Sequence, residues 1–434
     1  MIPPNIRSRG KLLCLSNGHG EDVIAARILE QLLQQPYAPE LAALPIVGEG
    51  RAYSHLNIPI IGPVQQMPSG GFIYMDGGQL WRDLQGGLIG LTLAQLRAVL
   101  HWSRNQQGAI LAVGDIVPLL FASLSGADYA FVGTAKSEYY WRDEKGWLPT
   151  TTRLERALGS VYLPWERWLM RSARCKAVFP RDKLTTEILQ QRGIPAFDLG
   201  NPMMDCLAPG DRVNKENEAW KRLKILLLPG SRAPEAEDNW KKIIRATRGV
   251  IAAFEEVLFL AAIAPGLSLE PFTSHLLTTG WELEMKKPQP LPLMPKDGLV
   301  FTQNNAILLV TTSAYSDCLQ TADLAIAMAG TATEQFVGLG KLAIAIPGNG
   351  PQFTPAFAEA QTRLLGESLI LVTHPDEVAG AIQSTLKDTA AVQLIAANGR
   401  RRMGGAGAAA RIANCLRAKM LEITDERKGT IYPL

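Results

Sequence analysis

Three glycine-rich turns combine residue types that bind anions. They span residues 16–21 (Ser-Asn-Gly-His-Gly-Glu), 228–232 (Leu-Pro-Gly-Ser-Arg) and 329–333 (Ala-Gly-Thr-Ala-Thr), and each follows a short apolar run. Glycines let backbone N–H groups come close to a phosphate, and a helix that starts at such a turn adds its N-terminal dipole. In an open parallel sheet, ligands bind at the carboxyl ends of the strands. The three turns are therefore candidate binding sites.

The two later turns offer hydrogen-bond donors for a phosphate. Gly230 permits the turn, Ser231 carries a hydroxyl, and Arg232 can pair with phosphate oxygens through two N–H groups. The other turn opens a predicted helix, and its candidate residues are Gly330, Thr331, Ala332, Thr333, Glu334 and Gln335. Either turn alone can simply end a strand. Two such turns on one predicted sheet favour ligand binding.

Two side chains are candidates for proton transfer. His19 lies in the first turn, and an imidazole titrates near neutral pH, so it can take a proton from an attacking hydroxyl. Asp115 follows the apolar run 109–113 and precedes a predicted helix with Pro118 in its first turn. The alternatives are an incidental histidine in a glycine-rich turn and an aspartate that only caps its helix. The residue pattern leaves both open.

Short apolar runs alternate with helical-period segments along the whole chain, which predicts parallel sheets built from β-α units. In the first half, strands are expected at 11–16, 41–47, 58–61, 109–113, 129–132, 177–179 and 196–199. A second series is expected at 224–228, 257–262, 306–310, 324–327, 342–346 and 368–372. The polar, breaker-rich stretch between them predicts two domains, 1–205 and 223–405, with a linker at 206–222 and a C-terminal helix within 406–434 that returns toward the first domain.

Length and composition agree with two α/β domains. The chain has 434 residues, which is more than one ordinary core supports. Its five cysteines are far apart and predict neither a disulfide framework nor a zinc site, so we expect a cytoplasmic protein. The net charge of +3 does not predict a nucleic-acid partner. No stretch has the roughly 20 apolar residues that would cross a bilayer.

Two segments bear on contact with a membrane surface. Residues 67–100 are glycine-rich and apolar, and residues 165–176 combine two tryptophans, Trp165 and Trp168, with four basic residues. Aromatic and basic side chains together suit the interface of an anionic bilayer. Packing of the same side chains in a core is the alternative, and the sequence slightly favours it. The oligomeric state stays open, with a homodimer among the options.

Taken in order, the motifs resemble lipid-A-disaccharide synthases and, more loosely, other B-type glycosyltransferases such as the peptidoglycan N-acetylglucosaminyltransferase. The matching segments are 113–118 around Asp115, Tyr140-Trp141-Arg142, 177–180, 192–195, Gly200-Asn201-Pro202-Met203-Met204-Asp205, 227–232 with Glu235, and 330–333. The first turn, Gly18-His19-Gly20-Glu21-Asp22, departs from the lipid A enzymes and is closer to the glycine-histidine loop of the peptidoglycan enzyme. A glutamate that binds ribose in the family falls on Gln335, one place after Glu334.

The resemblance implies a GT-B architecture, with two doubly wound Rossmann-like domains facing a central cleft. It implies an acceptor site in the first domain, with Asn17, Gly18, Gly20 and Glu21 as candidates, and a UDP-sugar in the second. Asp115 or His19 would be the general base of an inverting hexosyltransferase that needs no metal and no cofactor.

Three functions remain in competition at this stage. The first is transfer of a sugar, an N-acetylhexosamine or a hexose, from a UDP-sugar to a lipid-linked acceptor at the inner face of the cytoplasmic membrane, within glycolipid biosynthesis. The second is a non-hydrolysing UDP-sugar 2-epimerase, which shares the fold but lacks an acceptor. The third is a nucleotide-sugar-binding protein without turnover, for which Gln335 is the only hint in the sequence.

Overall fold

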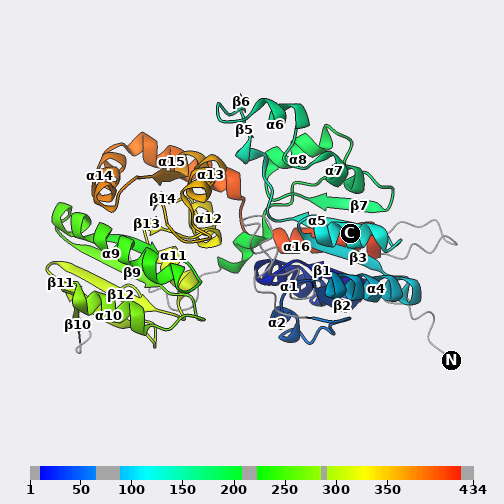
Figure 1. Cartoon of the computed structure of the whole chain (residues 1–434), viewed down its shortest axis with the longest axis horizontal. Coiled ribbons are helices and arrows are strands. Elements are labelled where there is room, and N and C mark those ends of the chain that lie inside the picture. Colours follow the sequence, from blue (N-terminus) through cyan, green and yellow to red (C-terminus); the bar gives the residue numbers. More distant parts are fainter. Residues whose placement is uncertain (1–9, 65–87, 208–221, 285–290, 422–434) are drawn as a thin grey trace. The chain divides into compact units, whose positions relative to one another are not determined.

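The computed structural model describes residues 10–64, 88–207, 222–284 and 291–421. The chain divides into two compact units, Met1–Pro202 with Gly407–Leu434 (unit 1) and Met203–Ala406 (unit 2). Each unit is a largely parallel sheet with helices on its faces (Figure 1). The expected linker lies mostly outside the described residues, and its first residues, up to Leu207, belong to unit 2. No helix in the described ranges is long and apolar enough to cross a bilayer.

Unit 1 contains a five-stranded parallel sheet in the order β2-β1-β3-β4-β7. Its strands are β1 (Lys11–Ser16), β2 (Glu40–Pro45), β3 (Ala109–Gly114), β4 (Tyr129–Gly133) and β7 (Cys175–Phe179). The strands are apolar almost throughout and buried, as expected for a parallel sheet covered on both faces. We expected strands at 58–61 and 196–199. Each segment makes one isolated bridge to the sheet, Ile60 with Ala43 and Ala196 with Val178, and forms no longer ladder.

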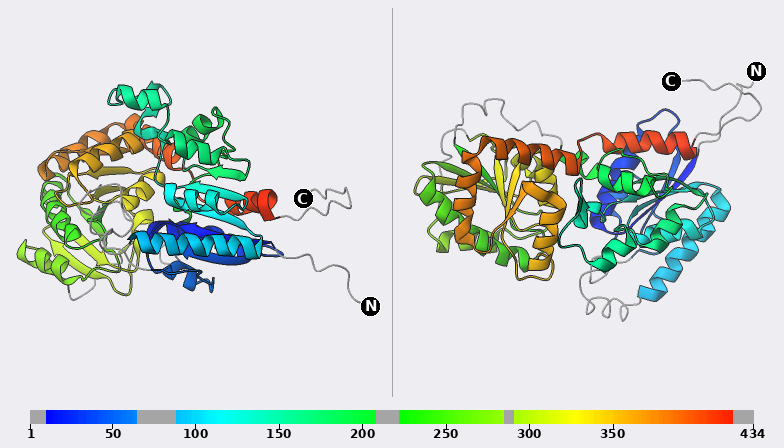
Figure 2. Two further views of the ribbon diagram at one scale, coloured as in Figure 1. Left: turned by 45° about the vertical axis from the view of Figure 1, so that its right-hand side comes forward. Right: turned by 90° about the horizontal axis from the view of Figure 1, so that it is seen from above.

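The helices of unit 1 connect these strands and cover the sheet. They are α1 (His19–Leu33), α2 (Arg51–Ser54), α4 (Leu88–Gln106), α5 (Ile116–Leu124), α6 (Arg153–Leu158), α7 (Pro164–Met170), α8 (Lys183–Gln190) and α16 (Ala408–Leu416). The C-terminal helix α16 packs against α1 (Figure 2). Two side-chain bonds hold it, from Gln35 Nε2 to Asn414 Oδ1 (2.7 Å) and from Arg411 Nε to the Leu199 carbonyl (2.9 Å). The last helix thus completes the first unit.

Unit 2 contains an eight-stranded sheet in the order β10-β11-β12-β9-β8-β13-β14-β15. Its strands are β8 (Leu223–Leu228), β9 (Val257–Ala262), β10 (Glu282–Leu283), β11 (Leu299–Gln303), β12 (Ala306–Thr311), β13 (Leu324–Ala327), β14 (Leu342–Ala345) and β15 (Leu369–Leu371). β11 pairs antiparallel with both β10 and β12. The sequence did not predict β10 and β11. β11 is joined to β12 by the two-residue turn Asn304-Asn305 and not by a helix, so it departs from the β-α pattern on which the prediction relied.

The helices of unit 2 lie on both faces of this sheet. They are α9 (Glu235–Ala253), α10 (Glu270–Thr278), α11 (Tyr315–Thr321), α12 (Thr331–Gly338), α13 (Pro355–Leu365), α14 (Val378–Lys387) and α15 (Thr389–Met403). Trp240 of α9 and Phe272 of α10 are buried against each other, with ring centroids 5.6 Å apart. The unit therefore has its own apolar core.

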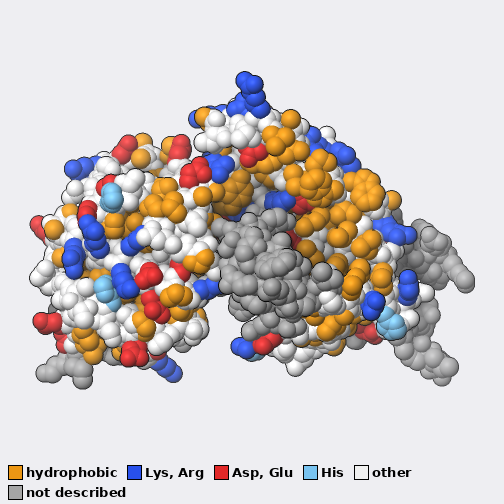
Figure 3. All heavy atoms as spheres, in the orientation of Figure 1, with side chains coloured by type: hydrophobic (Ala, Val, Ile, Leu, Met, Phe, Trp, Pro, Cys, Tyr) orange, Lys and Arg blue, Asp and Glu red, His pale blue; other side chains and the backbone are white. Residues whose placement is uncertain are grey.

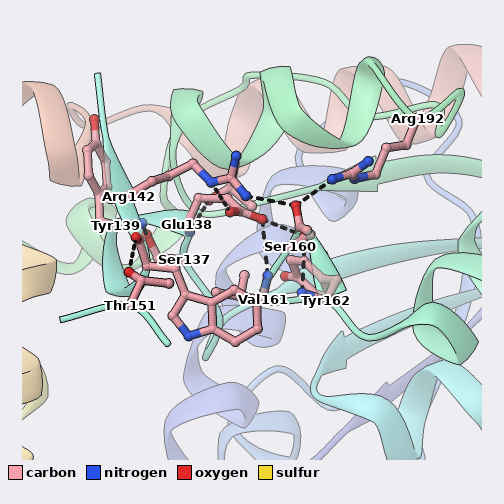
Figure 4. Close-up of polar contacts among 12 residues, drawn as sticks. Ser137, Glu138, Tyr139, Arg142, Thr151, Ser160, Val161, Tyr162 and Arg192 are labelled. Carbon is pink, nitrogen blue, oxygen red and sulfur yellow. Dashed lines mark hydrogen bonds and ion pairs between the residues drawn. The ribbon is translucent and has the colours of Figure 1, made fainter. Parts of the chain in front are cut away.

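A buried ionic cluster anchors the segment between β4 and β7 (Figure 4). The Glu138 carboxylate accepts hydrogen bonds from Ser160 Oγ (2.5 Å) and from the Val161 N–H (3.2 Å), and it pairs with Arg142 Nε at 2.9 Å. Arg142 also donates to the Gly159 carbonyl and stacks 3.6 Å above the Trp147 ring. Glu138 is fully buried, so its charge depends on these partners.

We therefore expect the Glu138→Ala variant to lose about 3 kcal/mol of unfolding free energy, because the change leaves the partly buried Arg142 without its counter-ion. Urea denaturation followed by circular dichroism measures the loss. Glu187→Ala is the matched control, since this exposed residue pairs with Lys183 only at 3.8 Å and should change stability by less than about 0.5 kcal/mol. Equal losses in the two variants would contradict this role of the cluster.

Candidate functional site

In unit 1 the chain changes its direction of strand addition at β1 and β3. The chain adds β2 on one side of β1 and then returns to add β3 on the other side. The carboxyl ends of the two strands pair in register, Ser16 beside Val113. Such a reversal leaves a crevice at the carboxyl edge, where ligands bind in open α/β sheets. The predicted turn 17–21 follows β1, and Asp115 follows β3, so both lie at this position.

Gly114 allows these two segments to approach closely. Its φ is 129°, and a Cβ placed on it would lie 3.1 Å from Asn17 Cβ and 3.3 Å from Glu21 Cγ. The turn therefore packs directly against the end of β3. Gly18 precedes α1 with a φ of 139°, and His19 is the first residue of the helix. The structure describes the backbone of His19, while its side chain lies outside the described atoms.

Asp115 caps helix α5 and remains partly exposed. Its Oδ1 accepts the Val117 N–H at 2.9 Å, which is the structural role that the sequence left open. Capping occupies one oxygen, and a carboxylate has a second oxygen with its own lone pairs, so the cap does not exclude a role as base. Burial raises the pKa of Asp115, the Val117 N–H lowers it, and the charges of Glu166 and Lys136 oppose each other.

Asp115 is close enough to Glu21 to raise the pKa of that carboxyl group. Glu21 Oε1 accepts from Thr134 Oγ1 at 3.2 Å, which connects α1 to the residue after β4. Burial raises the pKa of Glu21, and the negative charge of Asp115 raises it further. Gly20, another acceptor candidate, is exposed in the first turn of α1. The edge of the unit 1 sheet thus combines two carboxyl groups whose protonated forms are favoured by their surroundings.

An ion pair beside Asp115 was not among the expected site residues. Lys136 Nζ lies 2.8 Å and 2.6 Å from the two oxygens of Glu166, which is buried on α7 and also accepts the Leu163 N–H at 2.8 Å. Arg181, after β7, donates to the Thr134 carbonyl at 3.2 Å. The sequence could have indicated Lys136, because ligands bind at the carboxyl ends of parallel strands and Lys136 comes three residues after the end of β4.

In unit 2 the same reversal of strand addition occurs at β8 and β13. The two strands pair in register, with Leu228 beside Ala327. The turns 229–232 and 328–330 therefore leave the sheet side by side, and Asn239 Nδ2 donates both to the Pro229 carbonyl (3.0 Å) and to the Met328 carbonyl (3.4 Å). The structure brings together the two glycine-rich turns that the sequence predicts as anion sites.

The accessible groups at this position suit an anion. Ser231 and Thr331 are exposed and Arg232 is half-buried. Burial lowers the pKa of the Arg232 guanidinium, and the nearby Glu235 carboxylate raises it. Gly330 precedes α12, so the free N–H groups of this helix begin at the turn. No group of three or more His, Cys, Asp or Glu side chains in the described part of the chain is arranged to hold a metal ion.

Three of the predicted donor residues are packed inside unit 2. Thr333 is buried and donates to the Ala329 carbonyl at 2.6 Å. Gln335 uses both ends of its amide, with Nε2 donating to the Met203 carbonyl (2.9 Å) and Oε1 accepting from Tyr315 Oη (2.7 Å). Glu334 is also buried. In this conformation their side chains brace helix α12, and the turn presents Gly330, Thr331 and the partly exposed Ala332.

Similarity to known proteins is confined to the fold. No protein-family model matches the sequence, and no curated protein matches it. Among solved structures, the calicheamicin glycosyltransferase CalG4 covers 95% of this chain and 98% of its own at 13% identity and a TM-score of 0.59. MurG from Acinetobacter baumannii covers 94% and 99% at 16% identity and a TM-score of 0.55.

A UDP-GlcNAc 2-epimerase from Neisseria meningitidis, bound to UDP-GlcNAc, covers 94% of this chain and 100% of its own at 13% identity and a TM-score of 0.51. Transferases and epimerases therefore both share this architecture. The predicted α/β class, with two Rossmann-like units of GT-B type, is confirmed. At these identities the comparison says nothing about the residues that act.

A pH-dependent contribution to stability comes from Asp22, which is buried behind the first turn. Asp22 Oδ1 accepts from Ser16 Oγ (2.5 Å), and Ser16 Oγ also lies 2.5 Å from Tyr53 Oη. Burial raises the pKa of Asp22 from 3.8 to about 7, against the Ser16 hydrogen bond. The folded chain therefore holds a proton here between pH 4 and 7 that the unfolded chain releases. This stabilisation is fully present below pH 4 and is lost as the pH rises through about 7.

Asp22→Asn should remove this dependence, because the amide keeps an oxygen for Ser16 but does not titrate. Between pH 5 and 7 the parent should lose unfolding free energy relative to the variant by up to about 1.4 kcal/mol per pH unit. Urea denaturation at several pH values measures the difference, with the exposed Asp198→Asn as control. Parallel pH profiles for the parent and Asp22→Asn would contradict the protonated state of Asp22.

Proposed function

We propose that this protein is an inverting glycosyltransferase that moves a sugar from a UDP-sugar to a hydroxyl group of a lipid-linked acceptor. Unit 2 binds the donor and unit 1 binds the acceptor. The reaction belongs to glycolipid biosynthesis and takes place at the inner face of the cytoplasmic membrane. The transferred sugar is an N-acetylhexosamine or a hexose.

The observation that carries this proposal is the difference in chemistry between the two sheet edges. In unit 2, Ser231, Arg232 and the start of α12 present donors and positive charge, which suit a diphosphate. In unit 1, Glu21 and Asp115 present carboxyl groups, which suit sugar hydroxyls and proton transfer. A transferase needs both kinds of site, one for the leaving group and one for the nucleophile.

The chemistry follows from these groups. An acceptor hydroxyl attacks the anomeric carbon in line with the departing UDP, and Asp115 or His19 takes the hydroxyl proton. Arg232, Ser231 and the N–H groups after Gly330 stabilise the negative charge that grows on the diphosphate. Asp115 is suited to the base role because its surroundings raise its pKa toward the working pH.

A lipid-linked acceptor is supported by an exposed apolar face on unit 1, which we call the α5–α7 face. Leu120 and Leu124 of α5 are 39% and 52% exposed, and Trp165 and Trp168 of the neighbouring α7 are 57% and 72% exposed. Packing in a core, the alternative favoured by the sequence, is wrong for these two tryptophans. Figure 3 shows hydrophobic side chains gathered on this part of the molecule, with basic side chains nearby.

The composition of the α5–α7 face favours a bilayer over water. Helix α5 has no charged residue, whereas a surface helix of a water-facing protein normally has a polar outer face. Basic residues lie between and after the tryptophans, namely Arg167, Arg171, Arg174 and Lys176. Tryptophan and arginine together suit the headgroup region of anionic lipids. The other expected membrane segment, 67–100, lies partly outside the described residues, and only its part in α4 is seen.

Release of UDP tests the transferase directly. We expect the parent to release UDP from a UDP-sugar only when membrane lipid extract is added. Asp115→Asn should reduce kcat by about 10²- to 10⁴-fold if this carboxylate is the base, and His19→Ala should do so if the histidine is. Arg232→Ala should reduce kcat/KM by about 10²-fold or more, because it removes charge from the leaving group.

The outcomes separate the three functions. Conversion of UDP-GlcNAc without acceptor would show an epimerase. Thermal stabilisation by UDP without UDP release under any acceptor would show a binding protein. Glu359→Ala is the control variant, since this exposed residue of α13 forms an ion pair with Arg363 of its own helix, at 3.0 Å. If Asp115→Asn, His19→Ala and Arg232→Ala all matched the parent during turnover, the proposed site would be wrong.

Vesicle binding tests the α5–α7 face. The parent should co-sediment with vesicles rich in phosphatidylglycerol more strongly than with phosphatidylcholine vesicles, and added salt should weaken the binding. The double variant Trp165→Ser, Trp168→Ser should abolish vesicle binding and leave UDP binding unchanged. Leu154→Ser, at an equally exposed position on α6, is the control. A parent that dimerises through this face and ignores vesicles would assign the face to a second copy.

A further inference from the structure

One face of helix α9 contacts three loops at the edge of the unit 2 sheet, namely the two turns that follow β8 and β13 and the loop that follows β14. Glu235, Asn239 and Lys242 lie at positions i, i+4 and i+7, which places them on one side of the helix. Asn239 joins the turns after β8 and β13, as described above. The other two residues contact the loop after β14, residues 347–353, which we call the β14 loop.

Glu235 holds the end of the β14 loop through its carboxylate. Glu235 Oε1 accepts the Phe353 N–H at 2.6 Å, and both oxygens lie 3.2 Å from the Gln352 nitrogen. Glu235 is 8% exposed, so these contacts take place largely out of water. Hydrogen bonds to a charged acceptor are stronger than neutral ones, and their loss leaves backbone N–H groups unsatisfied.

The start of the same loop is held by Lys242. Its Nζ donates to the Pro347 carbonyl at 2.8 Å and lies 3.3 Å from Asn349 Oδ1. Between the two anchors, Gly350 lies directly against Glu235, because a Cβ placed on it would be 2.3 Å from Glu235 Cδ. The carboxylate is held by its own contacts and cannot move aside freely. The β14 loop therefore wraps the first turns of α9 without spare room.

We propose that Glu235 is a positioning residue for the nucleotide-sugar donor: it fixes the β14 loop at the sheet edge beside Ser231, Arg232 and Gly330, so that this loop forms one wall of the donor site. The inference rests on the proposed function, because it concerns the same ligand. Glu235 acts through the loop, without touching the donor.

The choice of a carboxylate supports this role over a purely structural link. A neutral side chain could also accept two backbone N–H groups, at lower cost of burial. Glu235 additionally lies near Arg232, where it favours the charged guanidinium against the effect of burial. One side chain thus orders the loop and lies beside the guanidinium that faces the diphosphate. Its removal should weaken donor binding by releasing the loop.

Binding of UDP, measured by calorimetry on the full chain, tests the proposal. Glu235→Ala should raise the Kd for UDP by about 10-fold, because the loop is then ordered in only a fraction of molecules. Glu235→Gln should have a smaller effect, since it keeps an acceptor for one N–H group. In turnover, both variants should raise the KM for the donor and leave kcat at saturating donor and the KM for the acceptor unchanged. Glu237→Ala, in the same turn of α9 but not buried, is the control.

A mutant cycle separates loop positioning from general damage. Gly350→Ala forces a methyl group against Glu235 and should also raise the Kd for UDP. The double variant Glu235→Ala, Gly350→Ala should bind UDP no more weakly than Glu235→Ala alone, because the vacated space accommodates the methyl group. Near-ultraviolet circular dichroism should show a folded unit 2 in each case, and Glu235→Gln serves if Glu235→Ala does not fold.

The outcomes distinguish this proposal from the function on which it rests. If the parent binds UDP and neither Glu235→Ala nor Gly350→Ala changes the Kd, the positioning role is wrong and the transferase proposal stands. If the effects of the two substitutions on the free energy of UDP binding were strictly additive, the proposed role of the contact between Glu235 and Gly350 would also be wrong. A parent that binds neither UDP nor a UDP-sugar would overturn the proposed function and this inference together.

Discussion

Each half of this protein is organised by one topological constraint, the reversal of strand order in a parallel sheet. Strands that run in the same direction end at the same edge, and a helix must return the chain before the next strand begins. Where the chain turns back past its first strand, two connections leave in opposite directions and the edge between them stays open. In this chain the reversal occurs at β1 and β3 and again at β8 and β13.

The two open edges carry opposite chemistry, although the scaffold is the same. At the edge of unit 1, Glu21 and Asp115 are drawn together by the close packing permitted at Gly114, and partial burial favours their protonated forms. At the edge of unit 2, helix α12 begins directly after Gly330 and Arg232 adds a charge that is always present. A carboxyl group whose pKa is raised by burial and a fixed positive charge suit the two ends of the proposed glycosyl transfer.

Side chains that never reach the edge also shape it. Gln335 and Thr333 hold helix α12 from inside, and Asn239 joins the turns that follow β8 and β13. The partly buried Lys136 and the buried Glu166 form an ion pair near Asp115. Because buried polar groups must find partners, each of these contacts fixes the distance between two loops. The open edges are therefore held by a second layer of polar contacts.

The sequence alone determined the α/β class, most strands and the positions of the two glycine-rich turns of unit 2, because buried parallel strands are uninterrupted apolar runs and glycines mark the turns between them. It also placed Asp115 correctly at the end of a strand. Local patterns could not show that Gln335 points to Met203, that Glu166 pairs with Lys136 thirty residues away, or that Trp165 and Trp168 face outward. These facts depend on which elements become neighbours, and strand order and helix packing decide that only in the folded chain.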